Sequence, residues 1–157
     1  MASEADLTRL SQELNRELEW FSNVDDVEGL ASVLRARVRD GDLKPEILLQ
    51  VERENRERWL PFMRLAVLEA LCEPAAEGRP WDTFEMPSDL LGTFLAAHAH
   101  ALYDAGFYQL AFDRVSEALA SSDAARQPHY LLSLRGHCAL AIGDFHGART
   151  SARLLPA

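Results

Sequence analysis

The sequence predicts an all-α protein of about eight helices, and three observations carry this prediction. Apolar residues recur at three- and four-residue steps, as Leu7, Leu10 and Leu14 do, which is the period of an amphipathic helix. No segment sustains a two-residue alternation of apolar and polar side chains, so we expect essentially no sheet. The segment 93–120 matches the segment 130–155 at an offset of 37 residues, which indicates a pair of helices that occurs twice.

Residues 1–72 are expected to form an N-terminal half of four helices. Capping residues and prolines indicate their bounds. The first runs from Ser3 to Ser22, the second from Asp25 or Asp26 to about Arg39, and the third starts at Pro45. The fourth apolar stretch is Trp59 to Cys72, in which Pro61 implies a helix break or a fresh start. Gly41 suits the left-handed position that follows a helix. The run Glu52 to Arg58 is charged except for one Asn. We interpret it as a solvated part of the third helix with i,i+3 and i,i+4 ion pairs, and the alternative is a charged docking surface.

Residues 73–87 are the one clear irregular connection, because they are rich in Pro and Gly. The bulky side chains Trp81, Phe84 and Met86 within it predict that it packs onto the body of the protein. Beyond it the pattern is helical again, with expected helices at about 88–104, 107–121, 128–142 and 145–155. We expect the whole chain to form one continuous domain.

The two copies of the repeat share a turn and an aromatic position. Gly106 and Gly143 each end the first helix of a pair, at a position where the backbone needs a positive φ. Tyr108 and Phe145 begin the second helix of each pair, and we interpret these rings as plugs between the helices.

Small residues recur where the two helices of each pair are expected to cross. These are Ala99, Ala111, Gly136 and Ala148. A large side chain at any of them would hold the helices apart and destabilise the fold by about 1–3 kcal/mol.

The repeated segment resembles the tetratricopeptide repeat family. The matching residues are Ala99, Gly106, Tyr108, Ala111 and Ala118 in one unit, and Gly136, Gly143, Asp144, Phe145 and Ala148 in the next. The resemblance covers about 65 of the 157 residues, and it departs from the family at Leu102 and Ala139, where an aromatic residue is usual. It implies a right-handed α-solenoid with two repeat-like hairpins over 88–157, and degenerate or capping hairpins over 1–72.

The same resemblance implies a concave groove along the first helix of each pair. Carried over by position, its lining is Thr93, Ala96, His100, Tyr103 and Asp104, followed by Tyr130, Ser133, His137, Leu140 and Ala141. This lining is mixed and weakly polar, so it favours an apolar or amphipathic segment of another protein. The stretches 103–108 and 135–139 are also similar to the small, acidic chaperones of bacterial type III secretion, which are built from three such repeats.

Charge and composition narrow the kinds of partner. The formal net charge of −9 argues against a nucleic-acid partner, and no stretch is apolar and long enough to predict a membrane span. With nucleic acid and membrane disfavoured, we expect the partner to be another protein or a second copy of this chain. Cys72 and Cys138 are isolated and no secretory signal precedes them, so we expect a cytoplasmic protein with reduced thiols. An alternative function is an acidic regulatory or toxin-neutralising protein that occludes a basic partner.

No pattern of catalytic or metal-binding residues stands out. The sequence lacks a glycine-rich phosphate loop, paired cysteines with zinc spacing and a nucleophile elbow, so we expect no catalytic residue, cofactor or metal. His100 and His137 are interpreted as groove polarity, and a small enzyme with a histidine site is the alternative. Cys138 is interpreted as a small buried hydrophobe.

Two further segments bear on binding. Arg35, Arg37 and Arg39 form a short basic run, which is either a solvated face with a helix-dipole role or a docking patch. The last expected helix carries Leu154 and Leu155 on a face that nothing in the pattern covers. We therefore expect a homodimer or a hetero-complex that involves the C-terminal hairpin.

Overall fold

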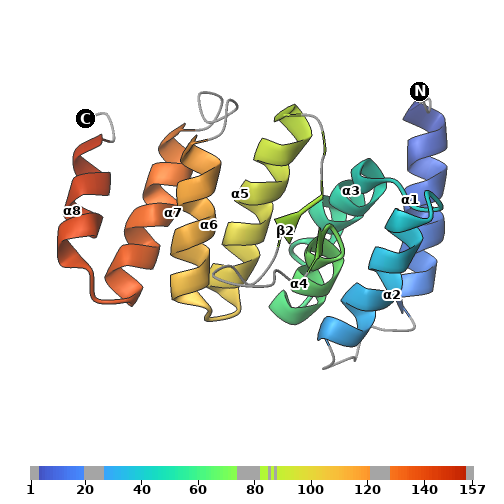
Figure 1. The fold of residues 1–157 in the computed structure, drawn as a ribbon, viewed down its shortest axis with the longest axis horizontal. Coiled ribbons are helices and arrows are strands. Elements are labelled where there is room, and N and C mark those ends of the chain that lie inside the picture. The colour runs from blue at the N-terminus through green and yellow to red at the C-terminus, as the bar shows by residue number, and fades with distance from the viewer. Residues whose placement is uncertain are drawn as a thin grey trace. The chain divides into compact units, whose positions relative to one another are not determined.

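The protein is described by a computed structural model, which covers residues 4–19, 27–73, 82–84, 86, 88–120 and 128–154. Several positions named above lie outside these residues, namely Ser3, Ser22, Asp25, Asp26, Trp81 and Leu155. The described part of the chain contains eight α-helices (Figure 1), so the all-α class is confirmed. None of these helices combines the length and the apolar character that a membrane crossing needs.

The helices and strands follow the chain in the order α1 to α4, β1 and β2, then α5 to α8. Their bounds are α1 Glu4–Glu19, α2 Val27–Arg39, α3 Pro45–Asn55, α4 Pro61–Glu69, β1 Cys72–Glu73, β2 Asp82–Thr83, α5 Ser88–Asp104, α6 Tyr108–Ala120, α7 Pro128–Ala141 and α8 Phe145–Leu154. The two strands are an antiparallel pair of two residues each. The expectation of essentially no sheet therefore holds apart from this short ladder.

The chain divides into two compact units, Met1–Glu85 and Met86–Ala157. The boundary falls inside the connection that the sequence predicts at 73–87. The ladder pairs Cys72 with Thr83, and the backbone N–H of Phe84 donates to the carbonyl of Leu71 at 2.9 Å. Residues 82–84 thus return to the end of α4, as expected of a connection that packs onto the body. The expectation of one continuous domain stays a prediction.

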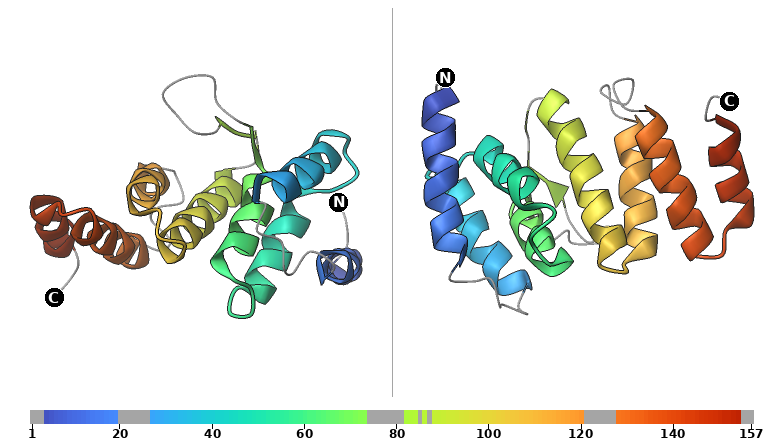
Figure 2. Two further views of the ribbon diagram at one scale, coloured as in Figure 1. Left: turned by 90° about the horizontal axis from the view of Figure 1, so that it is seen from below. Right: turned by 180° about the vertical axis from the view of Figure 1, so that it is seen from behind.

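In the first unit, alternate helices pack on each other. α1 packs on α3, α2 packs on α4, and α3 also packs on α4 (Figure 2). Pro45 is the first residue of α3, as the sequence predicts, and Pro61 begins α4, which decides between the break and the fresh start expected there. The fourth helix ends at Glu69 rather than at Cys72, because Cys72 pairs with Thr83 in the short ladder.

The hairpin order suggested for residues 1–72 pairs the first helix with the second and the third with the fourth. The contact of α3 with α4 agrees with it, and the contacts of α1 with α3 and of α2 with α4 are additional, so the repeat character of this half stays a prediction. A buried arginine contributes to the packing of α2 on α4. The guanidinium of Arg35 on α2 donates to the carbonyl of Cys72 in β1 and to that of Glu69 at the end of α4, the latter at 3.1 Å. The Glu69 carbonyl is one that the end of α4 leaves without a helical partner, so Arg35 ties α2 to α4.

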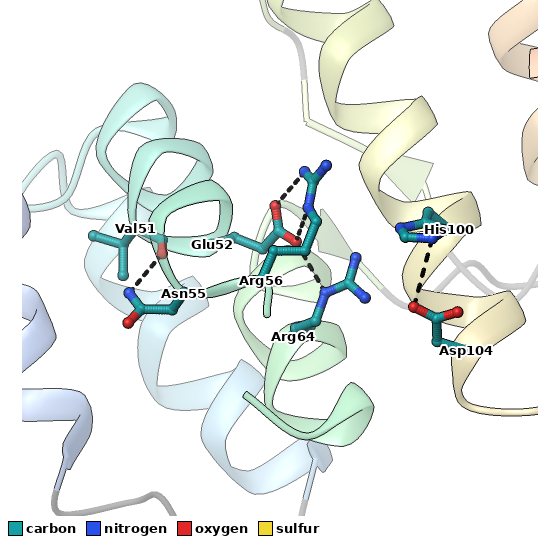
Figure 3. A network of polar contacts seen from close by, with 7 residues as sticks. All are labelled: Val51, Glu52, Asn55, Arg56, Arg64, His100 and Asp104. Atoms are coloured by element: carbon teal, nitrogen blue, oxygen red, sulfur yellow. Dashed lines mark hydrogen bonds and ion pairs between the residues drawn. The ribbon is translucent and has the colours of Figure 1, made fainter. Parts of the chain in front are cut away.

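The expectation that Glu52 to Arg58 is solvated is wrong at Glu52 and Asn55, which are both buried. The Glu52 carboxylate accepts hydrogen bonds from Arg64 Nε at 3.1 Å and from Arg56 at 2.8 Å (Figure 3). The Asn55 amide donates to Asn15 on α1 at 2.7 Å. The reason is tertiary, since α3 ends at Asn55 and the chain returns as α4 with a buried cation opposite Glu52.

In the second unit, consecutive helices pack on each other and α5 also contacts α7 (Figure 1). The helix bounds agree with the expected ones to within one residue at each end. Gly106 has φ of 89° and Gly143 has φ of 80°, which confirms the predicted turns.

Both turns close with the same two hydrogen bonds. The Phe107 N–H donates to the Leu102 carbonyl at 2.9 Å, and the Gly106 N–H donates to the Tyr103 carbonyl at 3.0 Å. Asp144 and Gly143 make the equivalent bonds to Ala139 and Leu140, at 2.8 and 3.1 Å. This is the Schellman motif, in which the left-handed glycine reverses the chain and pairs the last helical carbonyls.

The small crossing residues Ala99, Ala111 and Ala148 are buried, as predicted. Phe145 is exposed, with 68% of its surface accessible, so the prediction that it plugs its hairpin is wrong. Tyr108 has 39% of its surface accessible, and its ring contacts the ring of Tyr103 on the first helix of the same hairpin. The buried side of α8 is formed by Ala148 and Ser151. At about 100° per residue, Phe145 is rotated about 90° from the middle of that side, so it lies beside the contact with α7 rather than in it.

Candidate interaction surface

The first half of the candidate site is one side of α5. Thr93, Ala96, His100 and Tyr103 follow one another at three- and four-residue steps, so they lie on the same side of the helix. All four are exposed or half-buried, as is Asp104. The opposite side carries the fully buried Phe94, His98 and Ala101, which hold α5 in the core.

The second half is the matching side of α7. Tyr130, Ser133, His137 and Leu140 repeat the spacing of the α5 residues at the offset of 37, and all four are exposed. Tyr130 has 41% of its surface accessible. The buried side of α7 carries Leu134, Cys138 and other small or apolar residues.

Two ring contacts join the two helices. The rings of His100 and Tyr130 meet edge to face with centroids 6.1 Å apart, and those of Tyr103 and His137 are tilted at 6.3 Å. Tyr103 follows His100 along α5, and its partner His137 follows Tyr130 along α7. The two helices therefore run in the same direction. We call the surface formed by His100, Tyr103, Tyr130 and His137 the α5–α7 face.

Polar and aromatic neighbours border this face. The His100 Nε2 lies 3.6 Å from a carboxylate oxygen of Asp104, one turn further along α5 (Figure 3). The ring of Tyr103 also meets the ring of Tyr108 at 5.3 Å. Tyr108 was not among the predicted lining residues, and its exposed ring extends the aromatic surface onto α6.

The structure thus brings four of the predicted groove residues into contact and places Asp104 beside them. Thr93, Ala96, Ser133, Leu140 and Ala141 lie along the same two sides of α5 and α7 and are accessible. A concave groove along these helices stays a prediction.

The first unit contains a pocket of about 100 Å³ between α1 and the turn after α2. It is lined by Leu10, Glu13, Leu14, Glu17, Arg37, Gly41, Asp42, Leu43, Lys44 and Ile47.

A buried polar pair supports the face from behind. Arg114 Nε on α6 donates to His98 Nδ1 at 3.0 Å, and the guanidinium of Arg114 lies over the Phe94 ring at 5.4 Å. Because a guanidinium can only donate, His98 Nδ1 must be the acceptor, and the imidazole carries its proton on Nε2. His98 and His100 therefore point to different sides of α5, as their spacing predicts.

The other candidate residues have structural environments. Cys138 is fully buried, as predicted, and burial raises the pKa of its thiol to about 11, which keeps it protonated. Within the residues that the structure describes, no three His, Cys, Asp or Glu side chains gather closely enough to hold a metal ion. Arg37 pairs with Glu17 at 2.6 Å and with Asp42 at 3.1 Å, so Arg35 and Arg37 serve the fold of the first unit and form no free docking patch.

The fold and the site define an all-helical protein with an accessible aromatic and polar face on two parallel helices. Comparisons of the chain with protein-family models, with curated proteins and with solved structures find no match.

Proposed function

We propose that the protein is a protein–protein interaction module, an adaptor or chaperone-like scaffold, that binds an apolar or amphipathic segment of another protein across the α5–α7 face. The observation that carries the proposal is the paired arrangement of His100 with Tyr130 and of Tyr103 with His137. Tyrosine is enriched among the residues that dominate binding energies, because its ring buries a large area and its hydroxyl remains able to hydrogen-bond.

The proposal includes a tetratricopeptide-like organisation of residues 93–120 and 130–155 in a right-handed solenoid. Its support is the identical Schellman turns at Gly106 and Gly143, the buried Ala99, Ala111 and Ala148 at the crossings, and the parallel direction of α5 and α7. In this organisation the face belongs to the leading helices. The proposal also places the protein in the cytoplasm and assigns it no catalytic residue.

The test uses a library of displayed peptides that is selected on the intact protein. Ala96→Arg and Ser133→Arg place a long cation one turn before His100 and His137, so either change should abolish the binding of selected peptides. Ala120→Arg puts the same side chain on an exposed site of α6 and should leave binding unchanged. The proposal fails if the protein enriches no peptide, or if the enriched peptides bind both face variants as tightly as the unchanged protein.

A second candidate function is the occlusion of a basic partner by an acidic surface. The net charge of −9 favours it, as does α1, which carries five carboxylates and two arginines. Binding of this kind weakens steeply with salt, whereas burial of apolar and aromatic groups does not. Affinity for the selected peptides measured at low and at high salt separates the two functions.

A further inference from the structure

The outward side of α8 is a basic stripe. His146, Arg149 and Arg153 follow at steps of three and four residues, are all exposed, and lie opposite the buried Ala148 and Ser151. Within α8 there are two arginines and no carboxylate. The helix is therefore locally basic in a chain whose net charge is −9.

The two arginines of α8 are available for an external partner. Within the residues that the structure describes, no carboxylate lies at ion-pair distance from Arg149 or Arg153. The nearest acidic residue in the sequence, Asp144, caps α8 by accepting the N–H of Gly147 at 2.9 Å. The exposed ring of Phe145 lies one turn before Arg149 and adds apolar area beside the stripe.

The complementary feature is an acidic stripe on α1. Asp6, Leu10, Glu13 and Glu17 follow at steps of four, three and four residues, so they share one side of that helix, and the three carboxylates are exposed. Neighbouring cations neutralise part of this charge, since two of the three carboxylates have an arginine beside them and Glu13 lines the same pocket as Lys44. Arg9 lies 3.9 Å from Asp6, and Arg37 pairs with Glu17.

We propose that the protein binds a second copy of itself, with the basic stripe of α8 on one copy against the acidic stripe of α1 on the other. Arg149 and Arg153 are four residues apart on α8, as Glu13 and Glu17 are on α1, and Phe145 provides an apolar contact for the half-buried Leu10. Among the described helices, α1 packs mainly on α3 and α8 mainly on α7, so each keeps a broad side for a partner helix.

Such an interface joins two different surfaces, so it is heterologous. Copies joined in this way can add head to tail. Exposed ion pairs contribute little each and are screened by salt. The association is therefore weak and is strongest at low ionic strength. This self-association is independent of the α5–α7 face, because no residue of the two stripes belongs to that face.

The test is sedimentation velocity of the intact protein over a wide range of concentration, at low and at physiological salt. The unchanged protein should show a concentration-dependent rise in mean mass that salt suppresses. Arg149→Glu/Arg153→Glu reverses the α8 stripe, and Asp6→Arg/Glu13→Arg reverses the α1 stripe. Each double variant alone should associate about tenfold or more weakly, because like charges then face each other.

Mixing the two double variants provides the decisive measurement. The reversed α8 of one variant then meets the reversed α1 of the other, so the mixture should associate again. Arg39→Glu/Arg53→Glu makes the same change in net charge as the α8 reversal, at exposed sites of the first unit outside the α1 stripe, and should associate like the unchanged protein.

Three results overturn the proposal: a monomer at every concentration, association that survives either reversal, or a mixture that stays monomeric. A monomer that binds anionic lipid vesicles through Arg149 and Arg153 would assign the basic stripe to a membrane surface instead. Loss of self-association with retained peptide binding would leave the proposed function of the α5–α7 face intact.

Discussion

Cys138 lies in the middle of α7 with its side chain fully buried. Burial disfavours the thiolate and raises the pKa of the thiol from its ordinary value of 9.0 to about 11. Between these two values the unfolded chain releases the thiol proton and the folded chain keeps it. The contribution of Cys138 to the free energy of unfolding is thus complete below pH 9.0 and is lost as the pH rises to about 11.

We expect this loss to amount to roughly 2 kcal/mol at the alkaline end. It is measured as the difference in free energy of unfolding between the unchanged protein and Cys138→Ala, by urea denaturation at several pH values. The comparison with Cys138→Ala cancels the titration of tyrosines and other groups. A difference that stays constant with pH would contradict the assignment.

Glu52 and Arg64 form a buried ion pair in the first unit, with both side chains nearly inaccessible. Glu52→Leu leaves the Arg64 guanidinium in the core without this carboxylate and should lower the free energy of unfolding by about 3–5 kcal/mol. The double variant Glu52→Leu/Arg64→Met removes both charges and should recover most of that loss. Urea denaturation of the two variants measures the difference.

Glu54→Leu serves as the matched control, since Glu54 is exposed on the same helix and should change stability by about 0.5 kcal/mol or less. Equal losses in the single and the double variant would show that the pair contributes its packing volume rather than its charge. In the sequence, Glu52 and Glu54 belong to one charged run and are indistinguishable. The burial of Glu52 depends on α4, which brings Arg64 against it.

At the scale of elements, Gly136 within α7 and Gly143 in the turn after it should respond in opposite ways to replacement by alanine. Gly143 has φ of 80°, which side chains of L-residues rarely adopt, so Gly143→Ala should destabilise the protein by about 1–2 kcal/mol. A methyl group at Gly136 would lie 3.7 Å from Ser151 Cβ, an ordinary contact. Because glycine disfavours a helix interior, Gly136→Ala should be neutral or stabilise by up to about 1 kcal/mol.

The changes in the free energy of unfolding are measured from the urea denaturation midpoints of the two full-length variants. Destabilisation by Gly136→Ala of more than about 1 kcal/mol would show that α7 and α8 cross too closely for a methyl group. The prediction that this crossing needs a small residue is compatible with alanine, which stands at the equivalent position Ala99, and the added atom fits without a close approach.

The helices themselves follow from local signals. Prolines at the first positions of α3 and α4 and left-handed glycines after α2, α5 and α7 act within one or two turns, so the sequence predicts these boundaries closely. The exposure of Phe145 does not follow from such signals. It depends on which side of α8 meets α7, and Ala148 and Ser151 decide that side.

At the scale of the whole molecule, each compact unit has its own core. Leu102 is buried in the second unit, and Leu102→Ala should cost about 2–5 kcal/mol there. We expect faster amide hydrogen exchange in α5 to α8 and unchanged exchange in α1 to α4. Leu48→Ala, in the core of the first unit, is the reciprocal variant and should give the opposite pattern. An equal increase in both units would support the single cooperative domain that the sequence suggested.

The sequence by itself determined the all-helical class, the helix bounds of the second unit, and the turns at Gly106 and Gly143. These depend on periodicity and on the backbone preferences of glycine and proline, which act between near neighbours. The sides of α5 and α7 that carry the candidate site were implied by the resemblance to the tetratricopeptide repeat family. The tertiary structure alone decided the pairing of α1 with α3 and of α2 with α4, the burial of Glu52 with Arg64, and the contacts of His100 with Tyr130 and of Tyr103 with His137. Each of these joins residues far apart in the chain, and such contacts depend on how helices pack rather than on whether they form.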